Sequence, residues 1–123
     1  MHGYHSLEAW KHSHGTAVLV LRALDASDHS RCRDLFWQIR RAIVSVEANI
    51  VEGYALGTVG LFTKHLRIAM GSAAEAECLI RLAGELGYVT QEIVKAAENG
   101  LGAAMQLLYG LCRHPPRRFS RSK

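Results

Sequence analysis

A row of four polar residues lies along one face of a predicted helix in the first half of the chain. Arg41, Ser45, Asn49 and Glu52 follow one another at steps of four, four and three residues, and residues so spaced are neighbours on a helix surface. A guanidinium, a hydroxyl, an amide and a carboxylate in one line can bind a ligand or form hydrogen bonds with a neighbouring helix. We call these four residues the polar row.

The partner of the polar row follows from the connection that comes after it. If a turn near Gly57 joins two antiparallel helices, residues whose numbers sum to about 114 lie at the same height. Arg41 then lies beside the segment from Ser72 to Glu75. By the same rule Asn49 lies beside His65. We prefer a structural network between the two helices, and a binding site is the alternative. Allowing for a shift of one residue in register, the predicted members of this network are Arg40, Arg41, Ser45, Asn49, Glu52, Ser72 and Glu75.

Catalytic and metal-binding patterns are absent from the sequence. The helical two-metal signature requires a Glu-x-x-His motif on two helices, and neither Glu52 nor Glu75 has a histidine three residues later. The histidines near the N-terminus match no zinc spacing, so we interpret them as solvated or capping. The chain contains no GxSxG elbow and no GxxxxGK phosphate loop. We therefore predict no enzyme, no cofactor and no metal site.

Arginines around a tryptophan are better candidates for binding. Arg33, Trp37 and Arg40 are separated by four and three residues on the second predicted helix. Guanidinium groups contact phosphates and an exposed indole stacks on bases, which favours a surface for RNA or DNA. In the alternative, Trp37 packs on a neighbouring subunit and the arginines are solvated or paired. Equal height along the bundle also brings Arg81 of the third predicted helix beside Arg33. The residues predicted for this surface are Arg31, Arg33, Trp37, Arg40 and Arg81.

Positive charge is concentrated at the C-terminal end. The chain carries a net charge of +4, and residues 113–123 contain five basic residues and no acidic one, so the rest is close to neutral. We expect residues 1–112 to form the folded domain and residues 113–123 to form a flexible basic tail. In that tail Arg117, Arg118 and Arg121 would contact phosphates. Phe119 would stack on bases, whereas a merely solubilising tail is the alternative.

Length and composition point to one domain. At 123 residues, of which 49% are hydrophobic, the chain can bury a core without disulfides or a metal ion. Its three cysteines form no paired motif, which favours a reducing compartment. The sequence has neither a signal-peptide layout nor an apolar run long enough to span a bilayer. We expect a cytoplasmic protein with no membrane partner.

Helical periodicity predicts four helices and no strand. Their expected ranges are 6–25, 31–54, 59–86 and a segment from just after Thr90 to Leu111. The residues expected to cap or stop them are Ser6, Ser30, Thr90 and Gly87. Short connections make successive helices antiparallel neighbours, so the predicted fold class is an all-α, up-down-up-down four-helix bundle.

Each predicted helix has an apolar stripe that we expect to face the core. The four stripes comprise Leu7, Trp10, His14, Ala17, Leu21 and Leu24; Phe36, Ile39, Ile43, Val46 and Ile50; Phe62, Leu66, Ala69, Ala73, Ala76, Ile80 and Ala83; and Ile93, Ala97, Gly100, Ala104, Leu107 and Leu111. The third helix has a second apolar row, formed by Ile68, Leu79, Leu82 and Leu86. A small bundle needs one stripe per helix, so the second row favours self-association, with a wide core stripe as the alternative.

Ordered motifs in three of the helices resemble a known family. They are Leu7-x-x-Trp10, Gln38-x-Arg40-Arg41-Ala42, Ser45, Asn49-Ile50-x-Glu52-Gly53, Leu66-x-Ile68-Ala69-x-Gly71-Ser72-x-x-Glu75 and Leu86-Gly87-Tyr88. The chain resembles the four-helix-bundle proteins encoded in intervening sequences of bacterial 23S ribosomal RNA genes, over roughly residues 7–113. That family is similar in turn to the accessory proteins of diversity-generating retroelements. His65, where the family usually has an aromatic residue, Val51 and the basic tail depart from the family pattern.

The resemblance implies a homopentameric ring with a nucleic acid or a nucleic-acid enzyme as its partner, and it implies no catalytic activity. Together with the arginines around Trp37, it favours a non-enzymatic protein that holds RNA, DNA or a nucleic-acid-processing protein on basic surfaces. The alternative is a protein-interaction scaffold that does not bind nucleic acid, in which the polar row and the arginines serve assembly. A small-molecule or metal-binding bundle is a third and more distant reading.

Overall fold

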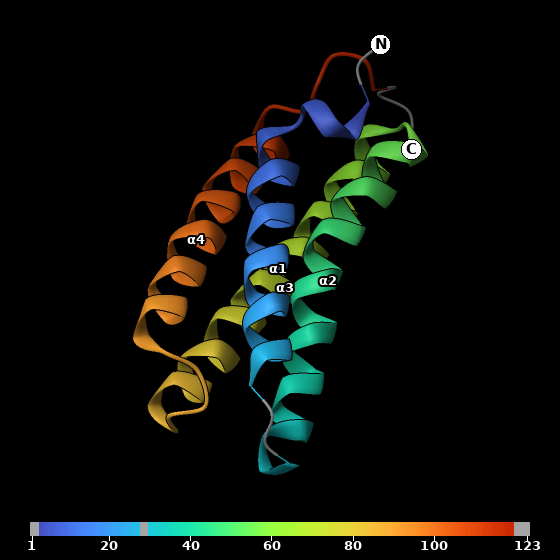
Figure 1. Cartoon of the computed structure of the whole chain (residues 1–123). Helices are drawn as coiled ribbons and strands as arrows, with labels where there is room; N and C mark the ends of the chain where they lie inside the picture. Colours follow the sequence, from blue (N-terminus) through green and yellow to red (C-terminus); the bar gives the residue numbers. More distant parts are fainter. Residues whose placement is uncertain (1–2, 28–29, 120–123) are drawn as a thin grey trace.

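The chain folds into four long helices that lie side by side (Figure 1). The computed structural model describes residues 3–27 and 30–119, and these residues form no strand. Short 3-10 helices, η1 and η2, precede the first two α-helices. In chain order the elements are η1 Tyr4–Ser6, α1 Glu8–Ala26, η2 Ser30–Cys32, α2 Arg33–Leu56, α3 Val59–Glu85 and α4 Gln91–Arg113. The predicted all-α class is confirmed.

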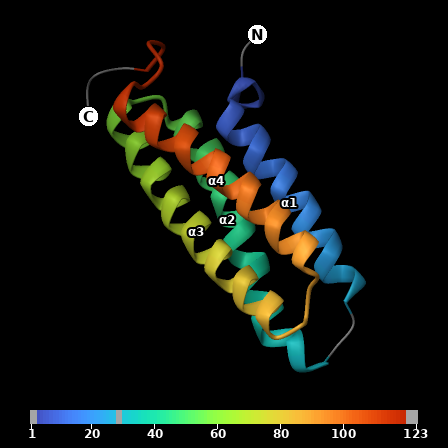
Figure 2. The same cartoon turned by 90° about the vertical axis from the view of Figure 1, so that its left-hand side faces the viewer.

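Successive helices run in opposite directions, as Figure 2 shows from a second side. Contacts between α2 and α3 follow reverse numerical order: Ser45 meets Ser72, whereas Asn49, further along α2, meets His65, earlier in α3. The most extensive packing joins α2 to α3, and α1 packs more extensively on α4 than on α2. The arrangement is the predicted up-down-up-down four-helix bundle.

The helix ends were predicted in part. Gly57 and Gly87 have φ angles of 80° and 78°, so each supplies the left-handed conformation that ends a helix. Thr90 caps α4 as predicted, because its hydroxyl accepts a hydrogen bond from the Ile93 N–H. The predictions for Ser6 and Ser30 are wrong: each belongs to a 3-10 turn that precedes the helix, and the N-cap positions fall on Leu7 and Cys32, which make no side-chain cap hydrogen bond.

The core stripes of α2 and α3 are buried as predicted, whereas those of α1 and α4 were predicted only in part: Ala17, Leu24, Ala97 and Ala104 are buried, and the other inward positions differ. In α1 the inward positions belong to small residues such as Ala9, Ser13 and Thr16, and the larger Trp10 and Leu21 lie at the edge. In α4 the buried residues are Val94, Ala97, Leu101, Ala104 and Leu108. Close approach of α1 and α4 explains the difference, because small side chains are needed where two helix backbones lie near each other.

Aromatic rings close the end of the bundle where the chain begins. The rings of Trp10 and His14 are stacked with centroids 4.7 Å apart, and Tyr4 and His5 meet Trp10 edge to face. His14 Nδ1 lies 3.0 Å from a carboxylate oxygen of Glu47. His14 is 48% exposed, so it does not face the core as its stripe predicts; it is solvated as expected for the N-terminal histidines, and its contact with Glu47 ties α1 to α2.

The segment after α4 folds back onto the same end. Phe119 is buried, and its ring stacks on Phe62 at 4.4 Å and meets Tyr54 edge to face at 5.5 Å. Arg118 lies over the Tyr54 ring at 4.3 Å and donates a hydrogen bond to the Tyr54 carbonyl. Up to Phe119 the tail is therefore packed on the bundle, because its aromatic residue completes the core between α2 and α3.

No helix in the described ranges is long and apolar enough to cross a membrane.

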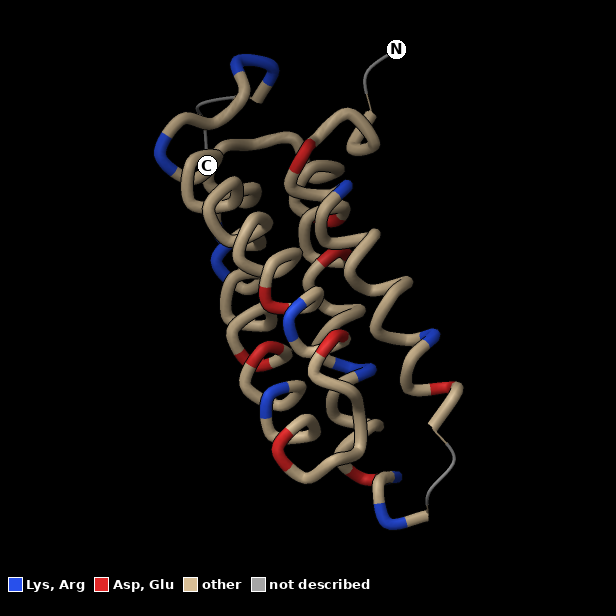
Figure 3. The backbone as a smooth tube through the Cα atoms, turned by 60° about the vertical axis from the view of Figure 1, so that its left-hand side comes forward, with Lys and Arg blue, Asp and Glu red and all other residues tan. Residues whose placement is uncertain are grey.

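The basic positions that follow α4 lie at the end of the bundle that also holds the N-terminus, as the blue segments in Figure 3 show. Arg33 lies at the other end, where α2 begins. The candidate basic residues around Arg33 and those after α4 therefore lie at opposite ends of the bundle.

Candidate functional site

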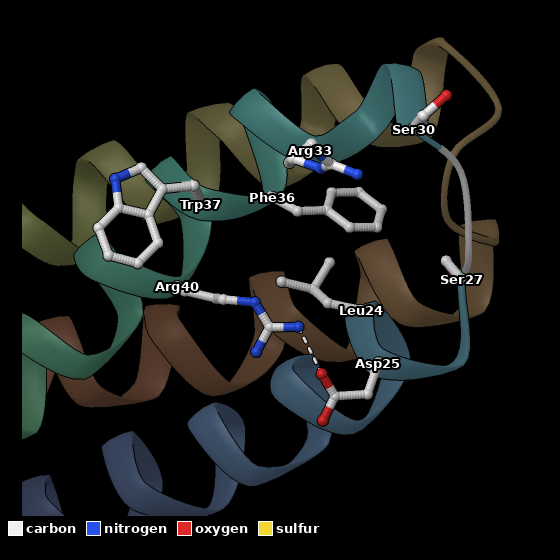
Figure 4. Close-up of a pocket in the computed structure, with 8 residues that line it drawn as sticks. All are labelled: Leu24, Asp25, Ser27, Ser30, Arg33, Phe36, Trp37 and Arg40. Atoms are coloured by element: carbon white, nitrogen blue, oxygen red, sulfur yellow. Dashed lines mark hydrogen bonds and ion pairs between the residues drawn. The ribbon is translucent and has the colours of Figure 1, made fainter.

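A cavity of about 370 Å³ opens between the end of α1 and the beginning of α2 (Figure 4). It combines cationic, aromatic and hydroxyl side chains within one small volume. The residues that line it are Leu24, Asp25, Ser27, Ser30, Arg33, Phe36, Trp37 and Arg40. We call this cavity the arginine pocket.

The helical spacing of α2 builds one wall of the arginine pocket. Arg33, Trp37 and Arg40 lie at steps of four and three residues, so their side chains leave the helix on the same side. Phe36 and Leu24 are buried at its base, where they anchor α2 to α1. A rigid apolar floor thus holds two guanidinium groups and an indole beside one cavity.

An ion pair crosses the arginine pocket. Arg40 Nη2 contacts Asp25 Oδ1, and Figure 4 shows the Arg40 side chain reaching across to α1. Asp25 belongs to the last turn of α1, where the helix dipole disfavours a negative charge, so Arg40 offsets this cost. Arg33 has no ion-pair partner among the described residues.

Trp37 is the most exposed of the large hydrophobic residues, with 65% of its surface accessible. Its indole forms no ring contact with any other described residue. An exposed indole beside two guanidinium groups is suited to stack on an unpaired base while the arginines contact its phosphate. The predicted grouping of Arg33, Trp37 and Arg40 is therefore present in the structure.

The prediction that Arg81 lies beside Arg33 is wrong. Arg81 Nη2 contacts Glu77 on its own helix at 2.9 Å and Glu98 on α4 at 2.8 Å. The hydrogen bond to Glu77, followed by the charges of both glutamates, raises the pKa of Arg81 above its ordinary value. Two residues at the same height along the bundle can point to different sides of it. Arg81 points toward α4, whereas the arginine pocket lies between α1 and α2.

The other predicted basic residues differ in their environments. Arg31 and Arg117 are exposed, and neither lines the arginine pocket. Arg118 is engaged with Tyr54, and the buried Phe119 is not free to stack on a base. Arg121 lies outside the described residues.

The polar row makes the contacts that the height rule predicts. Arg41 Nη2 donates to Glu75 Oε2 at 3.2 Å, and the hydroxyls of Ser45 and Ser72 are 2.8 Å apart. Arg40 does not take part, because it turns toward α1 and pairs with Asp25. Arg41 and Glu75 are 57% and 42% exposed, so this ion pair lies at the surface of the α2–α3 contact.

Asn49 holds the inner part of the row together. Its Nδ2 donates to the Ser45 carbonyl at 2.9 Å, which leaves its Oδ1 to accept from His65 Nδ1 at 3.0 Å. This assignment places the His65 proton on Nδ1, and Glu52 Oε1 lies 3.7 Å from the same nitrogen. The partners of the row belong to α2 and α3 themselves, which favours the structural interpretation over the binding site.

The arginine pocket includes three residues that no sequence pattern predicted, Asp25, Ser27 and Ser30. The same height rule, applied to the connection between the first two helices, brings the end of one beside the start of the other and so places Asp25 near the arginines. The two serines belong to that connection, and periodicity gives no signal there. No group of three or more His, Cys, Asp or Glu side chains that could hold a metal ion occurs in residues 3–27 and 30–119.

The match to a known family covers most of the molecule. A family model described as 23S rRNA-intervening sequence protein matches residues 5–110. The chain therefore belongs to this family, and the resemblance of its helical motifs is confirmed. No curated protein matches the sequence.

Proposed function

We propose that this member of the 23S rRNA-intervening sequence protein family is a non-enzymatic, cytoplasmic protein that binds unpaired RNA or DNA as a homopentamer. The observation that carries the proposal is the arginine pocket, in which Arg33, Trp37 and Arg40 line one cavity. Guanidinium groups supply phosphate contacts, and the exposed indole supplies a stacking surface.

Self-association would raise the affinity for a nucleic acid, because a single arginine pocket offers few contacts. The second apolar row of α3 supports self-association, because Ile68, Leu82 and Leu86 are 44%, 45% and 53% exposed. A heterologous contact that repeats around a closed ring leaves no such surface open. Five pockets on one ring would then engage one strand together, which raises avidity without any new contact.

Salt dependence of binding tests the proposal directly. Labelled single-stranded RNA, single-stranded DNA and duplex DNA are titrated with the full chain at several salt concentrations. If each of five subunits neutralises one phosphate, the log–log slope should be about −3.5 on single strands and about −4.5 on duplex DNA. Because an indole stacks on unpaired bases, single strands should bind more tightly, with little sequence preference.

Matched variants locate the site. Arg33→Ala/Arg40→Ala should weaken binding and flatten the salt slope, because phosphate contacts from every pocket are lost. Lys64→Ala/Arg67→Ala removes the same charge from exposed positions of α3, outside the arginine pocket, and should bind like the parent chain. Equal binding by all three proteins, or no binding by the parent chain at low salt, would contradict the proposal.

The basic residues after α4 require a different test. Truncation after Cys112 would also remove the buried Phe119 and so disturb the end of the bundle. Arg117→Ala/Arg121→Ala in the full chain leaves Phe119 and Arg118 in place. Weaker binding by this variant would add the tail to the nucleic-acid surface, and unchanged binding would leave it a solubilising segment.

The exposed apolar row of α3 also favours a second function, a protein-interaction scaffold without direct nucleic-acid binding. In that case the chain should capture a partner protein from native lysate after nuclease treatment, and the capture should depend little on salt. Loss of every partner on nuclease treatment would instead favour the nucleic-acid proposal.

A further inference from the structure

The arginine pocket contains an anion, Asp25, beside the groups that would hold a phosphate. The described residues that line it carry two guanidinium groups and one carboxylate, which leaves a net charge of +1. The carboxylate weakens a phosphate contact, because it repels the phosphate and competes with it for Arg40. This effect is the same for RNA and DNA, since both have the same phosphodiester. Any preference that Asp25 creates between them must therefore come from another part of the nucleotide.

The 2′-hydroxyl of ribose is the group that a carboxylate can recognise. An ionised carboxylate only accepts hydrogen bonds, and a 2′-hydroxyl can donate one, whereas deoxyribose has no donor at that position. In dinucleotide-binding folds an acidic residue contacts ribose in this way. A hydrogen bond to a charged acceptor is also stronger than one to a neutral acceptor. A carboxylate beside a phosphate contact can therefore distinguish RNA from DNA.

The ion pair with Arg40 leaves one oxygen of Asp25 available. Arg40 Nη2 contacts Oδ1, and no described residue donates a hydrogen bond to Oδ2. The Asp25 side chain is 68% exposed, so a hydroxyl group can reach it from solvent. Arg40 reaches from α2 to the end of α1 and restricts where the carboxylate lies (Figure 4). The pair thus presents an oriented hydrogen-bond acceptor inside the pocket.

The other side chains of the pocket can hold the rest of the nucleotide. Arg33 has no ion-pair partner among the described residues, so its guanidinium can contact the phosphate. The exposed indole of Trp37 can stack on the base. Figure 4 shows Trp37 on α2 and Asp25 on α1, with the Arg40 side chain between them. Base, phosphate and ribose therefore each have a separate contact in one cavity.

We propose that the arginine pocket prefers RNA to DNA, and that the carboxylate of Asp25 accepts a hydrogen bond from the ribose 2′-hydroxyl. The inference rests on the proposed nucleic-acid function and narrows its ligand to unpaired RNA. Arg33 contacts the phosphate, Trp37 stacks on the base, and Arg40 holds Asp25 against the ribose. None of these contacts needs a strand end, so several pockets can bind successive parts of one strand.

The test uses short single strands of adenosine that differ only at the 2′ position of the sugar. The three strands carry a 2′-hydroxyl, a 2′-hydrogen or a 2′-fluorine, and the last keeps the sugar conformation of RNA but cannot donate a hydrogen bond. Each strand competes at low salt with a labelled strand bound to the full chain. The 2′-hydroxyl strand should bind about three- to tenfold more tightly than either of the others, as expected for one exposed hydrogen bond to a charged group.

Asp25→Ala should reduce this preference to less than about twofold, because the acceptor of the 2′-hydroxyl is gone. The variant should still fold and bind both strands, since an ion pair this exposed contributes little to stability. The matched control is Glu75→Ala, which removes the carboxylate that pairs with Arg41 on the α3 side of α2 and should keep the parent ratio. A ratio compares two ligands on one protein, so a general effect of net charge cancels.

Three kinds of result would overturn the inference. Equal affinity for RNA and DNA in the parent chain, or a 2′-fluorine strand that binds like RNA, would show that no 2′-hydroxyl donor is recognised, while the nucleic-acid function stands. A ratio that Asp25→Ala leaves unchanged, or that Glu75→Ala also lowers, would show that Asp25 is not its source. If no strand binds at low salt, the proposed function fails together with the inference.

Discussion

Gly100 of α4 lies directly against Thr16 of α1. A Cβ atom at Gly100 would come within 1.9 Å of Thr16 Oγ1, closer than real Cβ atoms approach, and within 3.1 Å of Thr16 Cβ, which is tighter than most real contacts. Thr16 is buried, and its hydroxyl donates to the His12 carbonyl at 2.7 Å. The absence of a side chain at Gly100 is therefore what allows α1 and α4 to pack at this distance.

Gly100→Ala should lower the free energy of unfolding by about 1–3 kcal/mol, because the methyl group forces the helices apart. Gly102→Ala on the same helix is the matched control. No atom lies within 4 Å of the Cβ position there, so alanine should stabilise the protein by about 0.5–1 kcal/mol through its better helix propensity. Urea denaturation of the two variants measures both effects.

The double variant Thr16→Ala/Gly100→Ala should recover part of the loss, because the atom that the new methyl group meets is gone. A double-mutant cycle should give a coupling energy of about 1 kcal/mol or more between these positions. Strict additivity of the two single changes would show that Gly100 acts on stability without contacting Thr16.

Within the polar row the half-buried amide of Asn49 should matter more than the exposed ion pair. Asn49→Ala removes the acceptor of His65 and the donor to Ser45, and should cost about 1–3 kcal/mol. Glu75→Gln should cost less than about 1 kcal/mol, because its contact with Arg41 is solvent-exposed. Thermal unfolding ranks the two variants, and the reverse order would contradict the contacts described for Asn49.

Phe119→Ala should lower the unfolding free energy by up to about 3 kcal/mol, since it removes the ring that stacks on Phe62. The segment lies at the chain end and can detach while the bundle stays folded. The loss in unfolding free energy therefore cannot exceed the free energy with which the segment packs on the bundle. Phe119→Leu keeps most of the apolar volume and should cost clearly less. An unchanged melting temperature in Phe119→Ala would mean that the segment does not pack on the bundle in solution.

Leu82→Glu on the second apolar row of α3 should weaken self-association, because it places a charge on the exposed surface that we assign to the subunit contact. Sedimentation velocity should show a shift from the assembly toward monomer with little change in helix content. Tyr109→Glu, at a similarly exposed position of α4, serves as the control. A parent chain that sediments as a monomer at all concentrations would exclude the proposed ring.

The three cysteines should react with iodoacetamide in a fixed order. Cys78 is exposed and should be alkylated first. Burial raises the pKa of the Cys112 thiol, so less of it is thiolate at a given pH and its reaction should be slower. Cys32 is buried and should react only when the bundle opens. Mass spectrometry of a time course at pH 8 gives the order, and faster labelling of Cys112 than of Cys78 would contradict it.

Periodicity predicted the fold and the α2–α3 contacts well, because an unbroken apolar stripe, mostly large on α2 and mostly alanine on α3, occupies the inward positions and one turn fixes the register. It predicted α1 and α4 only in part. In α1 small residues such as Ser13 and Thr16 face inward and the large Trp10 lies at the edge, and in α4 Val94, Leu101 and Leu108 are buried instead of their predicted neighbours. Arg81 was misplaced because height along a bundle carries no information about the face. Phe119 was misread because arginines on both sides hide an aromatic residue that belongs to the core.

The two tight contacts of the bundle should report on different stages of folding. Ser45 and Ser72 join neighbouring helices, whereas Thr16 and Gly100 lie roughly three times as far apart along the chain, so the second contact closes a longer loop. We expect the α2–α3 hairpin to be formed in the transition state and α1 to dock on α4 afterwards. Asn49→Ala should then slow folding, whereas Gly100→Ala should mainly accelerate unfolding.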